Sequence, residues 1–384
     1  MSRKTMRERP FEYLRRQQTG EPFSQETIKN WYVARSFVLE RLKQISFAPG
    51  SNQHLNVVLD GDSPLMLAVL RHVALYSHYP NFIEYDALGH LACLNRTCIT
   101  LISNRDADAI VADLKSEECL CNLLDYCKLT VYGVVQNADS YLDIEVEIAH
   151  QTAEGNECVH ISETDVKSFL ESQSDESVYT IDTRKAVYAS KVYMLGAVID
   201  NVPYEDINGA GRYTQALDTF QYRVLRDTKG MQLASPSEWS TRPMASRNGL
   251  SNIFCSDCFA SRELAIKSLC PNYDKLGVKE RLNLWEEYNN QLSLSEHNRW
   301  TVEKLIMGFK PLSCRQRTEY ESLFETKRVA YGKLLKNNAA SAAHIDICSY
   351  RDLRRIDPNS LKYDSFLMLA IPHILGKVRK ESGE

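Results

Sequence analysis

Apolar and polar positions in the first third of the chain follow a pattern typical of an α/β sheet. Residues 25–45 place apolar side chains in steps of three and four, which predicts an amphipathic helix. Residues 56–62 form a β-branched run bounded by turn residues, followed by a helical pattern with Ser63 as N-cap and Pro64 at the first helical position. A second strand fits residues 98–102. Strand, tight turn, helix and strand in this order predict a doubly wound parallel sheet.

The same alternation continues through the middle of the chain. Its apolar runs predict three further strands and three helices. The expected strands are residues 129–135, 142–148 and 178–182, and the expected helices are residues 184–198, 213–226 and 254–269. Further on, a basic group is expected on a solvated helix face; its members are Lys327, Arg328, Lys333 and Lys336.

Residues 292–309 combine a helical pattern with an unusual set of polar and aromatic side chains. Glu296, Trp300 and Lys304 stand four residues apart, and His297 stands three before Trp300. One side of the helix therefore carries a carboxylate, an imidazole, an indole and an ammonium group. The alternative interpretation is a surface helix with a buried Trp anchor and an ion pair between Arg299 and Glu303.

Two motifs occur in the last quarter of the chain. The first runs from Glu296 to Trp300 and continues with Glu303, Leu305, Gly308 and Phe309; the second runs from His344 to Tyr350 and continues with Asp352, Leu353, Lys362, Asp364, Ile371 and Pro372. Together they resemble the bacterial form of the ryanodine-receptor repeat domain. Phe309 stands where that family usually has Trp, and the linker between the motifs is longer and more basic than expected. The resemblance implies a small, mainly α-helical domain.

In such a compact domain the two motifs are expected to face each other across one pocket. Trp300, Phe309 and Tyr350 are candidates to stack on a base, and Arg299, His297 and Lys304 are candidate donors to phosphate. The expected ligand-binding residues are Glu296, His297, Arg299, Trp300, Lys304, Phe309, His344 and Tyr350. We expect no catalytic residue and no metal site.

The strand and turn near residue 60 resemble the nucleotide-binding domain of Trk-type potassium-transport regulators. The glycine loop is degenerate, because Gly61 matches the first glycine but Ser63 replaces the second, and Asp62 adds negative charge where a phosphate would lie. Asn104 and Arg105 follow the second strand, where an acid would hold the ribose. Two interpretations stay open, a retained nucleotide site and a structural Rossmann-like shell.

The motifs divide the chain into four expected segments. They are an arm and lead-in helix at residues 1–50, a Rossmann-like domain at 51–203, a helical connector at 204–285 and the domain with the two motifs at 286–384. The expected fold class is therefore α/β, with a degenerate Rossmann-like doubly wound parallel sheet followed by a small helical domain.

Composition narrows the class of protein. The 384 residues are 43% hydrophobic and 25% charged, with a net charge of -4, so nothing in the whole chain favours DNA or RNA as a partner. No run approaches the roughly 18 apolar residues of a membrane helix, and the basic start lacks the apolar core of a secretion signal. We therefore expect a cytoplasmic protein without membrane insertion.

Cysteine usage agrees with a reducing compartment. Eleven cysteines, an odd number, are scattered without a regular framework. Cys255 and Cys258 form the only C-x-x-C motif, but there is no second pair or nearby His to complete a zinc site. We expect these two to be loop thiols.

Three classes of function are open. The leading one is a noncatalytic sensor that binds a small nucleotide-derived phosphorylated ligand, such as an NAD or ADP-ribose derivative or a cyclic nucleotide, and signals to a protein effector in bacterial defence or ion-transport regulation. The alternatives are an interaction scaffold without ligand and a nucleotide-dependent enzyme. Catalysis is the least favoured, because the sequence has no P-loop lysine, no G-x-S-x-G elbow and no paired metal-binding histidines. A homodimer is the default expectation.

Overall fold

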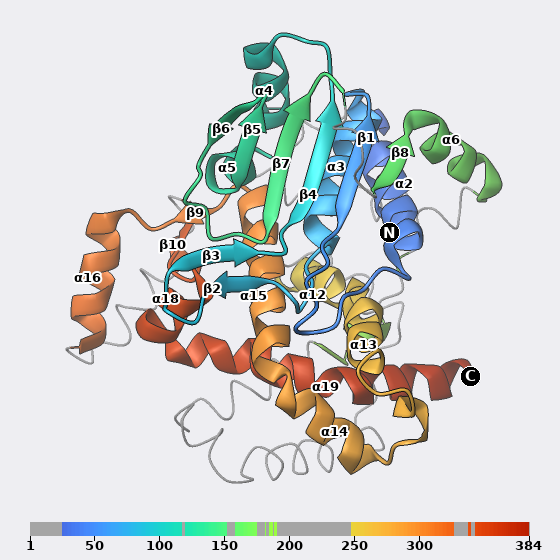
Figure 1. The fold of residues 1–384 in the computed structure, drawn as a ribbon, viewed down its shortest axis with the longest axis vertical. Helices are drawn as coiled ribbons and strands as arrows, with labels where there is room; N and C mark the ends of the chain where they lie inside the picture. The colour runs from blue at the N-terminus through green and yellow to red at the C-terminus, as the bar shows by residue number, and fades with distance from the viewer. Residues whose placement is uncertain are drawn as a thin grey trace, which may run out of the picture.

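The computed structural model describes residues 25–116, 120–151, 158–174, 181, 184–186, 188–189, 247–325, 337–338 and 342–383. It is a mixed α/β structure built on one six-stranded sheet, with a group of helices below it (Figure 1). The N-terminal arm, the helix expected at 213–226, the basic group near residue 330 and most of residues 178–198 lie outside the described residues.

The sheet has the order β6-β5-β7-β4-β1-β8 and is mostly parallel. Its strands are β1 (Asn56–Asp60), β4 (Thr97–Ile102), β5 (Lys128–Val131), β6 (Val134–Gln136), β7 (Ile144–Ala149) and β8 (Val159–Ser162). Only the β5 to β6 pairing among these is antiparallel. The strands predicted at 56–62, 98–102 and 142–148 are confirmed, whereas β8 was not predicted.

The single strand predicted at residues 129–135 is wrong, because a tight turn divides it into the hairpin β5-β6. Tyr132 and Gly133 both have positive φ, at 47° and 83°, which is the conformation of a two-residue hairpin turn. The chain therefore reverses in the middle of an apolar run.

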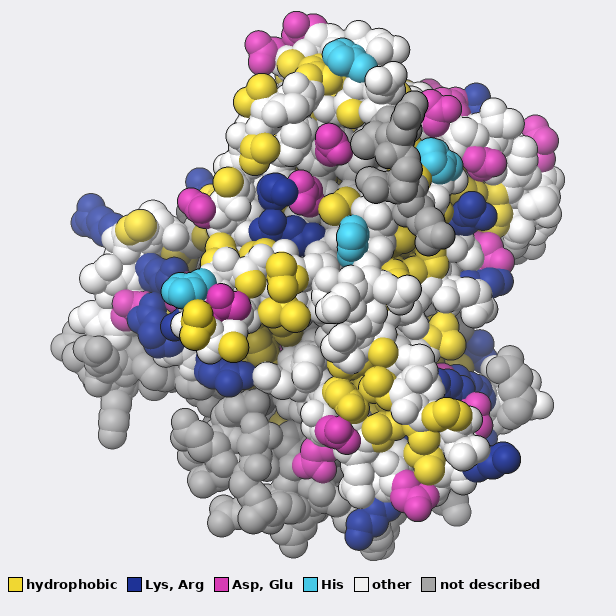
Figure 2. Space-filling view, in the orientation of Figure 1, with side chains coloured by type: hydrophobic (Ala, Val, Ile, Leu, Met, Phe, Trp, Pro, Cys, Tyr) yellow, Lys and Arg dark blue, Asp and Glu magenta, His cyan; other side chains and the backbone are white. Residues whose placement is uncertain are grey.

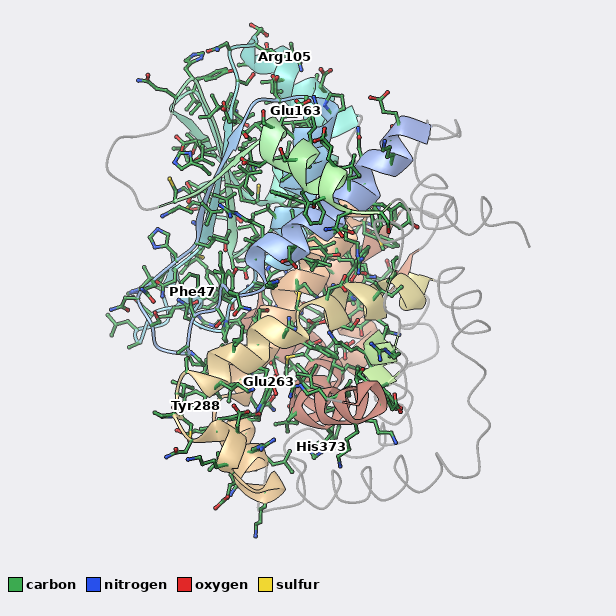
Figure 3. The ribbon with its side chains drawn as sticks, turned by 90° about the vertical axis from the view of Figure 1, so that its right-hand side faces the viewer. Phe47, Arg105, Glu163, Glu263, Tyr288 and His373 are labelled. Carbon is green, nitrogen blue, oxygen red and sulfur yellow. The ribbon has the colours of Figure 1, made fainter. Side chains whose placement is uncertain are left out.

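Helices α2 (Gln25–Leu42) and α3 (Pro64–Tyr76) cover one face of the sheet (Figure 3). Val57 and Leu59 on β1 point into the core that these helices share with the sheet. The predicted start of α3 is confirmed, since the Ser63 hydroxyl accepts a hydrogen bond from Met66 N and Pro64 is the first helical residue. Further helices along this half are α4 (Ala107–Ser116), α5 (Cys121–Tyr126) and α6 (Glu163–Ser172).

A second hairpin, β2 (Ile83–Tyr85) and β3 (Leu91–Leu94), precedes β4 and was not predicted. The hairpin lies near the amino ends of the parallel strands, beside the C-terminal helices (Figure 1). It is the part of the N-terminal half that reaches α18 (Tyr350–Ile356).

The C-terminal half consists of helices packed around α15 (Asn289–Ile306). Val302, Leu305 and Ile306 belong to the core of the sheet, so α15 joins the two halves. The other elements of this half are α12 (Arg247–Asp257), α13 (Phe259–Lys267), α14 (Val278–Glu287), α16 (Cys314–Glu325) and α19 (Pro358–Ser382), with a small sheet of β9 (Lys310–Pro311), β10 (Asn337–Asn338) and β11 (Ala343–His344). Within the described ranges, no helix has the length and apolar character needed to cross a membrane.

The structure corrects two predictions for the C-terminal half, the helix at 254–269 and the loop thiols. The helix expected at 254–269 is two helices, α12 and α13, with a break at Cys258. Cys255 lies within α12 and Cys258 at the turn between the two helices, and both are buried, so the expected pair of loop thiols is wrong. The predicted stop at Gly308 is confirmed, because this residue has φ +82° directly after α15 and its N–H donates to Leu305 O.

Candidate functional site

The two C-terminal motifs meet through their rings. The ring centroids of Trp300 and His344 lie 5.0 Å apart in an edge-on arrangement, and those of His297 and Tyr350 lie 5.6 Å apart. His297 Nε2 is 2.9 Å from the carbonyl oxygen of Cys348, to which it donates a hydrogen bond. The predicted proximity of the motifs is therefore present, and we call Trp300, His297, His344 and Tyr350 the ring cluster.

Trp300 is the member of the ring cluster that keeps the most accessible surface. It is half-buried, whereas His297 and Tyr350 are 2% and 5% exposed. The Lys304 ammonium lies 5.3 Å from the Trp300 ring centroid, within the range of a cation–π contact. Lys304 is also held by Glu303, since Nζ lies 2.6 Å from Glu303 Oε1. The cluster therefore presents one indole with a cation on it.

Arg299 does not belong to this accessible surface. Its side chain is fully buried, with Nη1 2.7 Å from Glu303 Oε2 and Nη2 2.8 Å from Glu296 Oε1. Arg262 from α13 adds a third contact, with Nη2 2.7 Å from Glu296 Oε2. Burial alone would raise the pKa of Glu296, but Arg299 and Arg262 lower it to about 2. The phosphate donor expected in Arg299 is thus already used inside the protein, and Glu296 is its structural partner.

His297 also has an internal role instead of the expected phosphate contact. Burial lowers the pKa of His297, which favours the neutral ring, and its Nε2–H donates to the carbonyl oxygen of Cys348. Its Nδ1 lies 3.8 Å from Asp364 Oδ2, and burial raises the pKa of Asp364 well above its ordinary value. His297 thus ties the two motifs together through its contacts with Cys348 and Asp364.

Phe309 lies in the core of the protein. It is 1% exposed, and its carbonyl oxygen accepts a hydrogen bond from Asn122 Nδ2 at 2.9 Å. Its apolar ring is a packing anchor, which leaves no surface for stacking on a base. The expected base-stacking role of Phe309 is therefore wrong.

The second candidate site is the carboxyl end of the parallel strands, where α/β sheets place ligands. Gly61 has φ +109°, a conformation that favours glycine. Asp62 Oδ2 accepts a hydrogen bond from Ser103 Oγ at 2.7 Å and lies 3.9 Å from Arg105 Nε. Arg105 is also paired with Asp113. The Arg105 guanidinium is therefore neutralised by two carboxylates, and Asn104 beside it is exposed.

The N-terminus of α3, which would hold a pyrophosphate, is occupied by side chains of the chain itself. The Ser63 hydroxyl caps Met66 N at 3.4 Å, and Pro64 contributes no N–H. Glu163, labelled with Arg105 at the same end of the sheet in Figure 3, has its pKa lowered by hydrogen bonds with Lys167 and Ser63. A second carboxylate thus lies where a phosphate would bind, which favours a structural role for this loop.

Sequence patterns gave no signal for two residues that organise the site. Glu84 from the unpredicted hairpin accepts hydrogen bonds from Tyr350 N at 2.8 Å and Arg351 N at 3.2 Å. Arg262 reaches Glu296 from another helix. Both contacts depend on tertiary packing, so no local spacing could reveal them.

Across the described ranges, no group of three or more His, Cys, Asp or Glu side chains is placed to hold a metal ion. Comparisons with protein families, with curated proteins and with solved structures give no match for this chain. The function must therefore be argued from the geometry of the ring cluster and of the sheet edge.

Proposed function

We propose that this chain is a noncatalytic cytoplasmic sensor in which the Trp300 surface binds the base of a small nucleotide-derived ligand. The observation that carries the proposal is the contact of one half-buried indole with the edge of His344 and the ammonium of Lys304. An indole face is a sequence-tolerant stacking platform, and a nearby cation attracts both the base and a phosphate. The resemblance to the ryanodine-receptor repeat supports a ligand at the same two motifs.

The surroundings of Trp300 restrict the chemistry of this ligand. Arg299 and His297 are engaged internally, and Lys304 and His344 border the Trp300 ring with partners of their own in Glu303 and Asp346. One ammonium group held by Glu303 suits a ligand of modest charge better than a triphosphate. Cyclic nucleotides and ADP-ribose derivatives are the classes that we propose to test first.

The sheet serves in this proposal as a degenerate Rossmann-like platform that no longer holds its own dinucleotide. Asp62 bonded to Ser103 and Glu163 beside Ser63 place two carboxylates at the former phosphate position. We propose that ligand binding at the ring cluster affects the β2-β3 hairpin through Tyr350, whose N–H donates to Glu84 on β2. We further propose that the sensor signals to a protein effector in bacterial defence or ion-transport regulation. We also propose that it is a homodimer.

An interaction scaffold is the second candidate function, and one observation favours it. The exposed large hydrophobic side chains of the described residues all lie on the two short hairpins β2-β3 and β5-β6; they are Ile83, Leu88, Leu91, Leu94, Val134 and Val135. Figure 2 shows yellow side chains grouped on the face that carries the β2-β3 hairpin. Apolar surface of this kind is typical of protein contacts.

The test is thermal unfolding of the full chain with a panel of NAD, ADP-ribose, cyclic AMP and a cyclic dinucleotide. At least one member is expected to raise the melting temperature, because a ligand that binds only the folded state stabilises it. Trp300→Ala should abolish the rise and Trp300→Phe should reduce it, since Phe offers a smaller face. Arg105→Ala, at the carboxyl end of the sheet, is the matched control and should keep the rise.

Two results would overturn this assignment. A rise that survives Trp300→Ala but is lost in Arg105→Ala would move the ligand to the sheet edge. If no ligand of the panel raises the melting temperature of a normally folded protein, the interaction scaffold is the better assignment.

A further inference from the structure

A cysteine and a histidine lie in contact at the edge of the sheet, away from both candidate sites. The Sγ atom of Cys158 is 3.0 Å from His160 Nε2. The two residues are separated by one position along the extended chain at β8, so their side chains project from the same face. His160 is exposed and Cys158 is half-buried, so both can be reached by a small reagent.

Most other cysteines of the described ranges are poorly placed for reaction. Burial raises the pKa of the thiols of Cys98 and Cys258 to about 11 and of Cys127 to about 12, and raises those of Cys93, Cys255 and Cys348 as well. Among the described cysteines, Cys158 is the one with an imidazole nitrogen at hydrogen-bond distance. Cys314 is exposed and offers a comparison without such a contact.

The strand register shows on which face of the sheet this pair lies. His160 pairs with Val58 on β1, which is buried but lies on the opposite side of the strand from Val57 and Leu59. Ile161, the next residue of β8, is buried in that core. A modification on the Cys158 side therefore projects from the face of the sheet opposite α2 and α3.

We propose that Cys158 is a modification site that exchanges with low-molecular-weight disulfides, with His160 as its proton acceptor. His160 Nε2 takes the thiol proton, and the Cys158 sulfur attacks one sulfur of the incoming disulfide. A new S–S bond forms to that sulfur while the original S–S bond breaks, and the second sulfur leaves as a thiolate. The leaving thiolate recovers the proton from His160, so one protein thiol and one disulfide give one mixed disulfide and one small thiol.

The experiment uses the reduced full-length protein, oxidised glutathione as the exchange probe and iodoacetamide as an independent thiol probe, at about pH 7. Mass spectrometry of the digested protein measures the rate at each cysteine. Cys158 is expected to react fastest, and His160→Gln should slow it about three- to tenfold, as expected when a thiol loses an imidazole partner. Cys314 is the internal reference, and its rate should not change.

The proposal fails if Cys158 reacts no faster than Cys314, or if His160→Gln leaves the Cys158 rate unchanged. An unchanged Cys314 rate and an unchanged circular dichroism spectrum show that the variant is folded. If His160→Gln does not fold, His160→Asn removes the same proton acceptor with a smaller side chain and gives the same decision.

Discussion

The carboxylate of Glu84 accepts a hydrogen bond from the backbone N–H of Tyr350 at 2.8 Å, across a sequence separation of 266 residues. A second bond comes from Arg351 N, so a strand of the first half caps a helix of the last. The Arg351 side chain also contacts the hairpin. Its Nη1 donates to Gly89 O at 2.8 Å, and its Cζ lies 4.8 Å from the Tyr85 ring centroid. The β2-β3 hairpin is thereby fixed next to the ring cluster.

Glu84→Gln is predicted to change how stability depends on pH. Burial raises the pKa of Glu84 from 4.5 to about 7, although the two backbone N–H groups act in the opposite direction. Between these values the unfolded chain releases the Glu84 proton before the folded protein does, so rising pH lowers the free energy of unfolding. The Glu84 contribution is complete below about pH 4.5 and is lost as pH rises through about 7, at most about 3 kcal/mol in all.

Urea unfolding at about pH 5 and about pH 8 measures this effect as a difference between proteins. Relative to the unmodified chain, Glu84→Gln should gain stability on going to the higher pH, because the amide side chain that it introduces cannot ionise. Glu171→Gln changes an exposed carboxylate and is the control. Its free energy of unfolding should differ from that of the unmodified chain by the same amount at both pH values. A Glu84→Gln difference that does not vary with pH would contradict the prediction.

Arg299→Ala is predicted to destabilise the protein by about 3–5 kcal/mol, because it leaves Glu296 and Glu303 buried without their shared partner. Lys43→Ala is the matched control. Lys43 is paired with Glu40, but both side chains are about half exposed, so its loss should cost less than about 1 kcal/mol. Chemical unfolding curves compare the two, and similar losses would show that the buried Arg299 network stabilises the fold no more than an exposed pair does.

Local signals in the sequence account for much of the fold. Ser63 and Pro64 define the start of α3, and Gly308 defines the end of α15, because caps depend on a few neighbouring residues. Strands β1, β4 and β7 were predicted for the same reason, as β-branched runs between turn residues. The hairpin at Tyr132 and Gly133 was missed although glycine within a strand pattern is a recognised sign of a break.

The site was only partly predictable. Two motifs with matching order anticipated that Trp300 and His344 would meet, but helical spacing could not show which side chains face inward. The polar groups of Arg299 and Glu296 suggested an accessible surface, whereas Arg262 from another helix completes a buried network. A pattern of residues reveals which side chains share a helix face, and tertiary packing decides whether that face meets solvent, ligand or protein.

Two glycine substitutions are predicted to have opposite effects on stability. Gly308 has φ +82° at the end of α15, and this turn places Phe309, whose N–H donates to Lys304 O at 2.8 Å. Gly308→Ala should cost about 1–2 kcal/mol, because a Cβ disfavours the left-handed conformation. Gly376 lies inside α19, where an added Cβ would meet no neighbouring atom within 4 Å, so Gly376→Ala should gain up to about 1 kcal/mol from helix propensity. Urea unfolding of both variants gives the test, and changes of the same sign would show that backbone conformation does not decide the effect at Gly308.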